Sequence, residues 1–322
     1  MIETSEPTPL ISLGAVGTHQ RVFLKDESVQ PTGTFKDRLA ARAVEPGGHE
    51  TLFGSISYGN TALSFSHACS RTAWARFVAF VPLGFADWSF GPSSSGRCAT
   101  GADFNSAIQA KGGAVLEVDL SAGILDDDAL ERLAREAGLL GNSAFVNVTE
   151  GLSEPAYAAI GSEALEQLGD PPDICIVQFG AGILANELRD IFAAASERTI
   201  VVPVSTPDPR SLARMLYGPI WTDVAALEAD GRAMSRHASP DRTGRIREPY
   251  QVYRISEAQV ARGLEIAGAL GISAEPSGAA GLGFLDALHR VVPGYDCERD
   301  RVLVVNTGNG IDGLERMAKD LR

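Results

Sequence analysis

The residue of this sequence best suited to covalent chemistry is Lys36, in the stretch QPTGTFKDR, residues 30–38. It follows a Thr-Gly-Thr-Phe run and stands close to the expected start of a helix. A lysine amine can form an imine with an aldehyde and, once free, can move a proton as base or acid. Most lysines, however, are ordinary solvated residues. The stretch alone leaves open whether Lys36 is solvated or anchors a cofactor.

Two segments carry hydroxyl groups in turns. SYGNTA, residues 57–62, precedes an expected helix, where such a turn either presents backbone N–H groups to an anion or caps the helix through Asn60 or Thr61. Later in the chain, the run RVLVVN leads into the glycine-rich turn NTGNG, which contains Thr307. A hydroxyl at the carboxyl end of a parallel strand lies where α/β proteins bind ligands.

The segment GAGILA, residues 180–185, lies between an apolar run and an expected helix. Its glycines allow the backbone to approach a phosphate closely, although a tight turn without a ligand explains them equally well. The segment also matches the dinucleotide fingerprint G-x-G-x-x-A, which requires an acidic residue near the end of the next strand. That strand, TIVVPVS, ends at Ser205, and the first acid beyond it is Asp208. A nicotinamide-dependent interpretation is therefore open but incomplete.

Strands and helices alternate along the chain. Strands are expected in RVFLK, RFVAFVP, AVLEVDL, ICIVQF, TIVVPVS and RVLVVN, several of which are almost wholly apolar. Helices are expected at residues 126–138, which begin with three aspartates, and at 256–271, where Ser256 and Gln259 have capping-box spacing. Residues 230–251 have no clear pattern and are expected to be irregular. Alternating strands and helices predict an α/β fold with parallel sheets.

Composition restricts the class of partner. The 322 residues carry 28 Lys and Arg against 41 Asp and Glu, a net charge of -13, which disfavours nucleic acid and anionic membranes. The 4 cysteines are scattered and form no metal-ligand spacing with the histidines, so neither disulfides nor a metal site are expected. No stretch is long and apolar enough to span a bilayer, and no export signal is evident. These features predict a cytoplasmic protein with a small-molecule partner.

Taken in order, these motifs resemble those of the pyridoxal-phosphate enzymes of the tryptophan synthase β-subunit fold, also called fold type II, and within them threonine synthase. KDESVQPTGTFKDR resembles that family's cofactor-lysine motif, SYGNTA its substrate-carboxylate turn and GAGILA its phosphate loop. AEPSGAAGLG and NTGNG resemble its C-terminal elements, so that the similarity extends from about residue 10 to 312.

The resemblance implies a fold and a set of site residues. It implies two open, mostly parallel twisted sheets flanked by helices, with a smaller substrate-side domain, residues 48–142, inserted into a larger cofactor-binding domain, residues 1–47 and 143–322. Lys36 would hold pyridoxal 5'-phosphate as a Schiff base, Asn60 would bond its phenolic oxygen and Thr307 would face its ring nitrogen. Glu275 would lie near the ring, in a structural or catalytic role, and the protein would be a homodimer. The cofactor phosphate would be held by Gly180, Ala181, Gly182, Ile183 and Leu184, and the substrate carboxylate by Ser57, Tyr58, Gly59, Asn60 and Thr61.

The sequence departs from threonine synthase near the substrate. Tyr58 stands where that enzyme usually has serine, and the segment NVTEGLSEPAYAAIGSE lacks the basic residues that contact a substrate phosphate. Without cations, a dianionic leaving group would be poorly bound. Either another cation, such as Arg97 or an arginine of residues 242–247, meets the phosphate, or the substrate carries none. Phosphohomoserine is accordingly expected to be a poor substrate.

The resemblance predicts a pyridoxal-phosphate-dependent lyase or synthase of amino acid metabolism. A neutral hydroxyl at the ring nitrogen suits β- or γ-elimination or replacement on an amino acid better than transamination. Two alternatives remain open from the residues. One is a nicotinamide-dependent oxidoreductase that uses GAGILA, and the other is a cofactor-binding protein that has lost turnover.

Overall fold

The computed structural model describes residues 7–45, 48–57, 59–120, 125–148, 154–180, 182–206, 233–237 and 250–319. The chain divides into two compact units, and neither of them is continuous in sequence. Unit 1 comprises Met1–Glu6, Ser28–Ala156 and Asn309–Arg322, whereas unit 2 comprises Pro7–Glu27 and Tyr157–Gly308. Each unit contains its own parallel sheet.

Unit 2 is built on a seven-stranded sheet. Its five central strands run parallel to one another, and an antiparallel strand closes each edge. In spatial order the strands are β1 (Leu10–Val16), β2 (His19–Asp26), β13 (Val302–Asn306), β9 (Ile174–Gln178), β10 (Ile200–Ser205), β12 (Tyr250–Arg254) and β11 (Ala233–His237).

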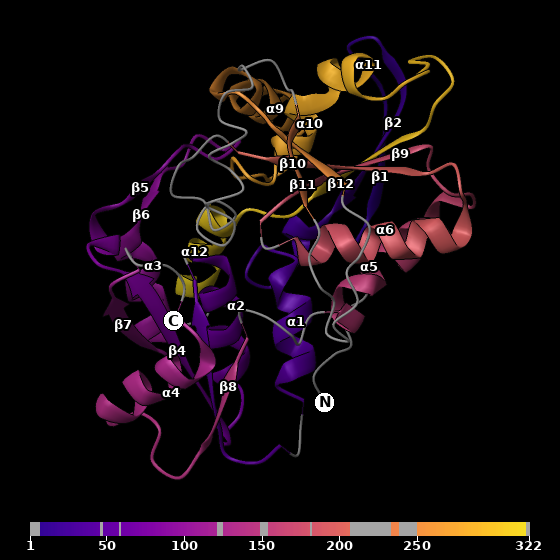
Figure 1. Cartoon of the computed structure of the whole chain (residues 1–322). Helices are drawn as coiled ribbons and strands as arrows, with labels where there is room; N and C mark the ends of the chain where they lie inside the picture. The colour runs from indigo at the N-terminus through magenta and orange to yellow at the C-terminus, as the bar shows by residue number, and fades with distance from the viewer. Residues whose placement is uncertain are drawn as a thin grey trace. The chain divides into compact units, whose positions relative to one another are not determined.

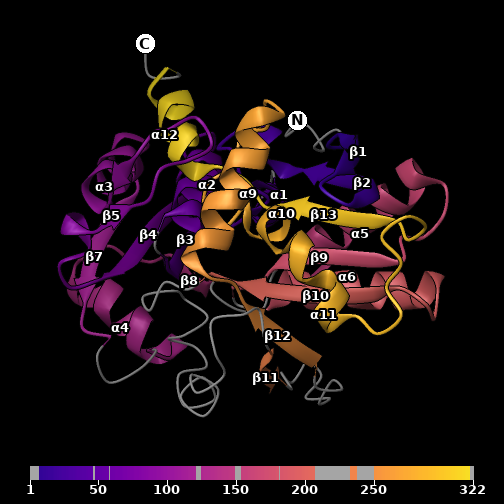
Figure 2. The ribbon, with the colours of Figure 1, turned by 90° about the horizontal axis from the view of Figure 1, so that it is seen from above.

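Helices cover both faces of this sheet, as Figures 1 and 2 show. On one face lie α5 (Glu154–Leu168) and α6 (Ile183–Ala195), and on the other lie α9 (Glu257–Ala269), α10 (Ala280–Phe284) and α11 (Leu288–Val291). Short 3-10 turns form η1 (Glu27–Val29) and η3 (Leu285–Ala287). Because both faces are covered, β13 and β9 are apolar almost throughout, and residues such as Ile176 and Val304 are fully buried. Each such side chain contributes about 1.5–3 kcal/mol through burial.

Unit 1 contains a four-stranded, wholly parallel sheet. Its strands are, in spatial order, β7 (Ala114–Val118), β4 (Ala75–Pro82), β3 (Thr51–Ile56) and β8 (Ala144–Asn147). Its helices are α1 (Lys36–Ala43), α2 (Asn60–Cys69), α3 (Gly101–Ala110), α4 (Asp127–Glu136) and α12 (Gly310–Lys319), with a 3-10 turn, η2 (Phe85–Asp87). A two-stranded hairpin, β5 (Ser89–Phe90) with β6 (Ala99–Thr100), precedes α3. Stacked phenylalanines, including Phe65 and Phe77, fill the space between α2 and the sheet.

The expected α/β fold with parallel sheets flanked by helices is confirmed. The helix at 256–271 has the predicted capping box, in which Ser256 Oγ accepts from Gln259 N–H and the Gln259 side chain accepts from Ser256 N–H. The expectation for residues 230–251 is wrong in part, because β11 and the start of β12 lie within them and pair with each other. The domain limits expected from the sequence remain a prediction. Among the described residues, no helix is long and apolar enough to cross a membrane.

Candidate active site

Lys36 is the first residue of α1 in unit 1. Its backbone N–H donates to Thr34 Oγ1 at 3.2 Å, and its Nζ lies 4.7 Å from the centroid of the Phe35 ring. The side chain is half-buried, and burial lowers the pKa of Lys36 from 10.5 to about 8. Removing an ammonium group from water disfavours its charge. Near neutral pH, a larger fraction of Lys36 than of an ordinary lysine is therefore a neutral, nucleophilic amine.

Hydrogen bonds to the carboxylate of the next residue, Asp37, fix the conformation of the loop before Lys36. Asp37 Oδ2 accepts from Thr32 N–H at 2.7 Å, and Asp37 Oδ1 accepts from Thr32 Oγ1 at 2.7 Å. Thr32 Oγ1 also lies 3.0 Å from Ser64 Oγ of α2, which joins the loop to that helix. Burial raises the pKa of Asp37 to about 6, although hydrogen bonds from Thr32 and Ser64 act in the opposite direction. Asp37 thus fixes the chain that carries Lys36.

Asn60 begins α2, and its side chain lies against the start of α12. A Cβ at Gly310 would collide with Asn60 Oδ1, so this approach requires glycine. Gly33 O accepts from Asn309 N–H at 2.7 Å, which joins the lysine loop to the same turn. Three motifs distant in sequence therefore come together within unit 1. They are PTGTFK, SYGNTA and the end of NTGNG.

The turn before Asn60 is closed by a serine hydroxyl. Ser57 Oγ accepts from Gly59 N–H at 3.3 Å and from Ala62 N–H at 3.2 Å. Ser57 Oγ thus accepts from an N–H of the first turn of α2, whereas the N-cap residue is Gly59, so neither Asn60 nor Thr61 is the N-cap that the simpler interpretation expected. The N–H groups of the first turn of a helix point toward its N-terminal end, and with the helix dipole they suit that end to a carboxylate.

In unit 2, the glycine loop joins β9 to α6. Gly182 is the N-cap of α6 with φ 83°, a conformation that favours glycine, and it provides no side-chain cap. No acidic residue occupies the first turn of this 13-residue helix. The N–H groups of Ile183 and Leu184 therefore point out of the helix with the positive end of its dipole, which is an arrangement suited to an anion.

Thr307 follows the C-terminal end of β13 and is buried. Because β13 pairs with β9 in parallel, Thr307 and the glycine loop both follow the carboxyl ends of their strands and lie at the same end of the sheet. Ligands of α/β proteins bind at the carboxyl ends of parallel strands. Nearby, Glu275 N–H donates to Gly308 O at 3.1 Å, and Glu275 Oε1 accepts from Ser277 Oγ at 2.6 Å. These contacts join the Glu275 segment to the residue after Thr307 within unit 2, and whether Glu275 is structural or catalytic stays a prediction.

The expected site residues are thus described as two groups. Those of unit 1 are Lys36, Ser57, Gly59, Asn60 and Thr61, and those of unit 2 are Gly180, Gly182, Ile183, Leu184 and Thr307. Tyr58, Ala181 and the arginines of residues 242–247 lie outside the described residues. Arg97 forms an ion pair with Glu315 of α12.

Sequence reasoning missed the residues that support these groups. Asp37 and Asn306 are direct neighbours in sequence of Lys36 and Thr307, and both are buried polar side chains. A signal for Asn306 was present, because it is the one polar residue of the strand Val302–Asn306. Among the described residues, no cluster of His, Cys, Asp and Glu could hold a metal ion.

Comparison with known proteins finds similarity along most of the chain. A family model described as pyridoxal-phosphate dependent enzyme matches residues 3–308. Diaminopropionate ammonia lyase of Escherichia coli, in complex with D-serine, superposes with a TM-score of 0.66 at 18% identity, covering 99% of this chain and 89% of that chain. O-ureido-L-serine synthase gives a TM-score of 0.63 at 19% identity, covering 98% of this chain and 92% of that chain.

A third solved structure, a threonine deaminase of T.th., gives a TM-score of 0.62 at 18% identity, covering 95% of this chain and 92% of that chain. At such identities the superpositions show a common fold. No curated protein sequence matches the chain.

Proposed function

Because the chain belongs to the pyridoxal-phosphate dependent enzymes, we propose that it uses this cofactor for β- or γ-elimination or replacement on an amino acid, in the manner of threonine synthase. The observation that carries the proposal is the position of Lys36, which begins α1 after a loop that hydrogen bonds join to α2 and to the turn before α12. Burial lowers the pKa of Lys36 to about 8, so its amine is partly neutral near neutral pH, as attachment to an aldehyde requires. The nicotinamide alternative gains no support, because the family match is to a different cofactor.

Within each unit taken by itself, residues fit some of the chemical groups of pyridoxal phosphate. Lys36 would hold the aldehyde carbon, and the N-terminus of α6, with Gly182 as N-cap and no acid in its first turn, would hold the phosphate. Asn60 would bond the phenolic oxygen, and the Thr307 hydroxyl would meet the ring nitrogen. When bound, the cofactor provides an electron-accepting ring that withdraws charge from the Cα atom of an amino acid.

Side chains and backbone groups of the protein would then move the substrate's Cα proton and orient the substrate. The Lys36 amine, once free, would remove the proton from the substrate Cα and deliver it again. The first turn of α2, with Ser57 closing the turn before it, would receive the substrate carboxylate. Thr307, a neutral hydroxyl, would leave the ring nitrogen without a full positive charge, which favours elimination or replacement over transamination.

The first test is the visible spectrum of the purified protein incubated with pyridoxal phosphate. We expect a yellow band that borohydride bleaches in the wild type and that is absent in Lys36→Ala, together with a loss of activity of roughly 10²–10⁴-fold or more. Lys111→Ala, which removes a lysine of the same unit away from the motifs, should keep both. A protein that stays colourless with added cofactor would refute the proposal, and a coloured protein without turnover would support a binding role instead.

The second test concerns the leaving group. We propose that the substrate carries no phosphate, since NVTEGLSEPAYAAIGSE has no basic residue and Arg97 already pairs with Glu315. Solved structures of this fold are named for diaminopropionate, threonine and O-ureido-L-serine, none of which is named as phosphorylated. In a turnover screen of amino acids with β or γ leaving groups, phosphohomoserine should therefore react at least about tenfold more slowly than the best substrate, because its dianion lacks a paired cation. Comparable rates would contradict this expectation. That the protein is a homodimer, and that it is cytoplasmic, both remain predictions.

A further inference from the structure

A buried pair of polar side chains adjoins Thr307, and one of the two residues directly precedes Thr307 in the sequence. Asn306, the last residue of β13, pairs in register with Asp26, the last residue of β2, and Asn306 Nδ2 donates to Asp26 Oδ1 at 2.8 Å. We propose that Asp26 and Asn306 are positioning residues that set the shape of the Thr307 turn and so aim its hydroxyl at the cofactor ring. The inference rests on the proposed function in one respect, namely that Thr307 meets the ring nitrogen.

Three hydrogen bonds hold the Asn306 side chain, and one of them closes the Thr307 turn. Nδ2 donates to Asp26 Oδ1 and, at 2.9 Å, to Ser273 O, while Oδ1 accepts from Gly308 N–H at 3.1 Å. The last bond passes around Thr307, from the residue before it to the residue after it. Asp26 and Ser273 O together fix the Nδ2 end of the amide, and this fixes which way Oδ1 points. The Asp26 carboxylate is the side-chain part of this support, and through Asn306 it contributes to the position of Gly308 N–H.

The other side of the turn is held by the segment that contains Glu275. Gly308 O accepts from Glu275 N–H at 3.1 Å, and a Cβ at Gly278 would collide with that same carbonyl oxygen. Gly308 itself has φ 132°, a conformation that side chains rarely adopt. Both polar groups of the Gly308 backbone are thus bound, and Thr307 has little freedom to change its direction.

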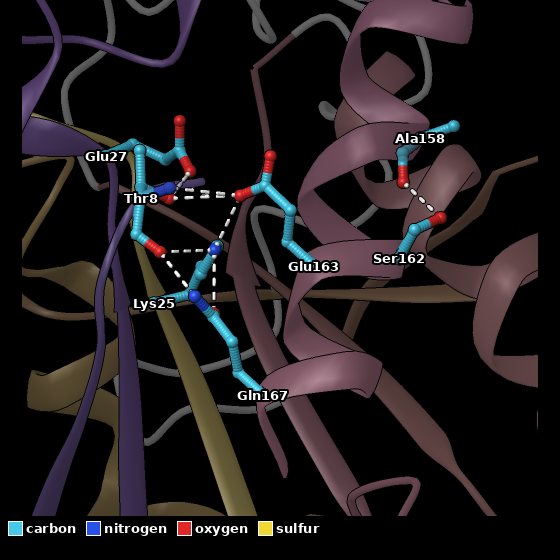
Figure 3. A network of polar contacts seen from close by, with 7 residues as sticks. All are labelled: Thr8, Lys25, Glu27, Ala158, Ser162, Glu163 and Gln167. Atoms are coloured by element: carbon cyan, nitrogen blue, oxygen red, sulfur yellow. Dashed lines mark hydrogen bonds and ion pairs between the residues drawn. The ribbon is translucent and has the colours of Figure 1, made fainter. Parts of the chain in front are cut away.

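Asp26 is itself held rigidly by its neighbours in sequence. Residues alternate between the two faces of a strand, so Lys25 lies on the face opposite to Asp26. There Lys25 Nζ contacts Glu163 Oε2 at 2.7 Å and Gln167 Oε1 at 2.9 Å, both on α5 (Figure 3). Glu27 Oε1 accepts from Thr8 Oγ1 at 2.6 Å. The end of β2 is therefore anchored on one face and presents Asp26 on the other.

A purely structural role would not require these residue types. The rest of β13, Val302–Val305, is apolar, and a buried polar pair is usually no more stabilising than apolar residues of the same volume. Asp26 is 6% exposed and Asn306 is 0% exposed, so both are withdrawn from water at a cost. What the pair adds is a defined direction for the next residue of the chain, Thr307.

The test compares Asp26→Ala and Asp26→Asn with the wild type. In Asp26→Ala the amide of Asn306 loses its carboxylate partner, and we expect pyridoxal phosphate to bind about tenfold or more weakly, with a shifted visible band. In Asp26→Asn the new side-chain oxygen can still accept from Asn306 Nδ2, so affinity and spectrum should return to within about threefold of the wild type. Rescue by this variant separates positioning from a need for negative charge.

Asp173→Ala provides a matched control, because Asp173, just before β9, binds the residue that precedes β13. Asp173 Oδ2 accepts from Arg301 N–H at 2.7 Å, just before β13 begins, so this change removes a carboxylate hydrogen bond at the opposite end of the strand. Both alanine variants should lower the melting temperature of the cofactor-free protein. Only Asp26→Ala should weaken the binding of cofactor and speed hydrogen exchange at the Gly308 amide in the cofactor-free protein.

The outcomes are distinct. Equal effects of Asp26→Ala and Asp173→Ala on cofactor affinity, or an unchanged band in Asp26→Ala, would overturn the positioning role while leaving the proposed function intact. A failure of Asp26→Asn to recover would also overturn it. A wild-type protein that takes up no cofactor would overturn the proposed function, and this inference with it.

Discussion

At the scale of single residues, Lys36 and Asp37 show how burial prepares a reactive group. The two side chains are adjacent, and burial moves the pKa of Lys36 down to about 8 and the pKa of Asp37 up to about 6. In both cases the charged form is disfavoured. For Asp37, the ionised form that predominates above about pH 6 is unfavourable in the folded loop, which lowers the stability of the fold there. For Lys36, the neutral amine, which is the nucleophilic form, becomes available at a lower pH than in an ordinary lysine.

The pH dependence of cofactor uptake follows from the lowered pKa of Lys36. At pH 7 a lysine with a pKa of about 8 is roughly one-tenth neutral, compared with about three parts in ten thousand for a pKa of 10.5. Because the neutral amine is the nucleophile, the rate of uptake should rise about tenfold between pH 6 and 7 and level off above about pH 8. Stopped-flow absorbance of the cofactor-free protein measures this rate.

The control for this measurement is Nα-acetyl-lysine mixed with the same cofactor, whose rate should still be rising at pH 9 because its amine is fully solvated. A protein profile that coincided with that of the model amine would show that Lys36 is not desolvated.

At the scale of secondary structure, β2 and α5 are joined by a buried ion pair. Lys25 is fully buried, and its Nζ lies 2.7 Å from Glu163 Oε2 and 2.7 Å from Thr8 O. Thr8 N–H also donates to Glu163 Oε2 at 3.1 Å, so the carboxylate links the chain before β1 to the helix. Figure 3 shows these side chains converging from the three segments.

Removing one partner of this ion pair should lower the free energy of unfolding more than removing both partners. In Glu163→Leu the buried Lys25 ammonium loses its carboxylate, which should lower the free energy of unfolding by about 3–5 kcal/mol. In the double variant Lys25→Met, Glu163→Leu most of this loss should be recovered, because no unpaired charge remains and Gln167 Nε2 can still donate to Thr8 O. Urea unfolding followed by circular dichroism compares the two. A double variant less stable than Glu163→Leu would mean that the ion pair contributes in another way.

At the scale of the whole molecule, the sequence predicts the fold better than it predicts the support of the site. The apolar runs at β9, β10 and β13 identify buried parallel strands without any structural information. By contrast, β11 reads AMSRH and has no strand-like alternation, so its pairing with β12 could not be predicted. Lys36 and Thr307 belong to local motifs, which a sequence displays directly.

The contact between Asp26 and Asn306 depends on the register of two strands whose residues are 280 positions apart. No local pattern specifies such a register, and the polar side chain at the end of an apolar strand was the single indication of it. Asp37 was missed for a related reason. Although Thr32 lies close to Asp37 in sequence, the other partner, Ser64, becomes a neighbour only when α1 packs against α2.

The division of the chain between the units has a consequence for the order in which the protein is made. The residues that complete the lysine loop lie beyond the whole of unit 2. Arg316 Nη1 donates to Ser28 O at 2.8 Å and to Gln30 O at 3.0 Å, and Asn309 N–H donates to Gly33 O at 2.7 Å. During translation these donors leave the ribosome about 270 residues after Lys36, at roughly 5–20 residues per second. A nascent chain therefore contains Lys36 long before it contains the groups that hold the loop around it, and we expect any cofactor binding at Lys36 to be delayed until synthesis has passed α12.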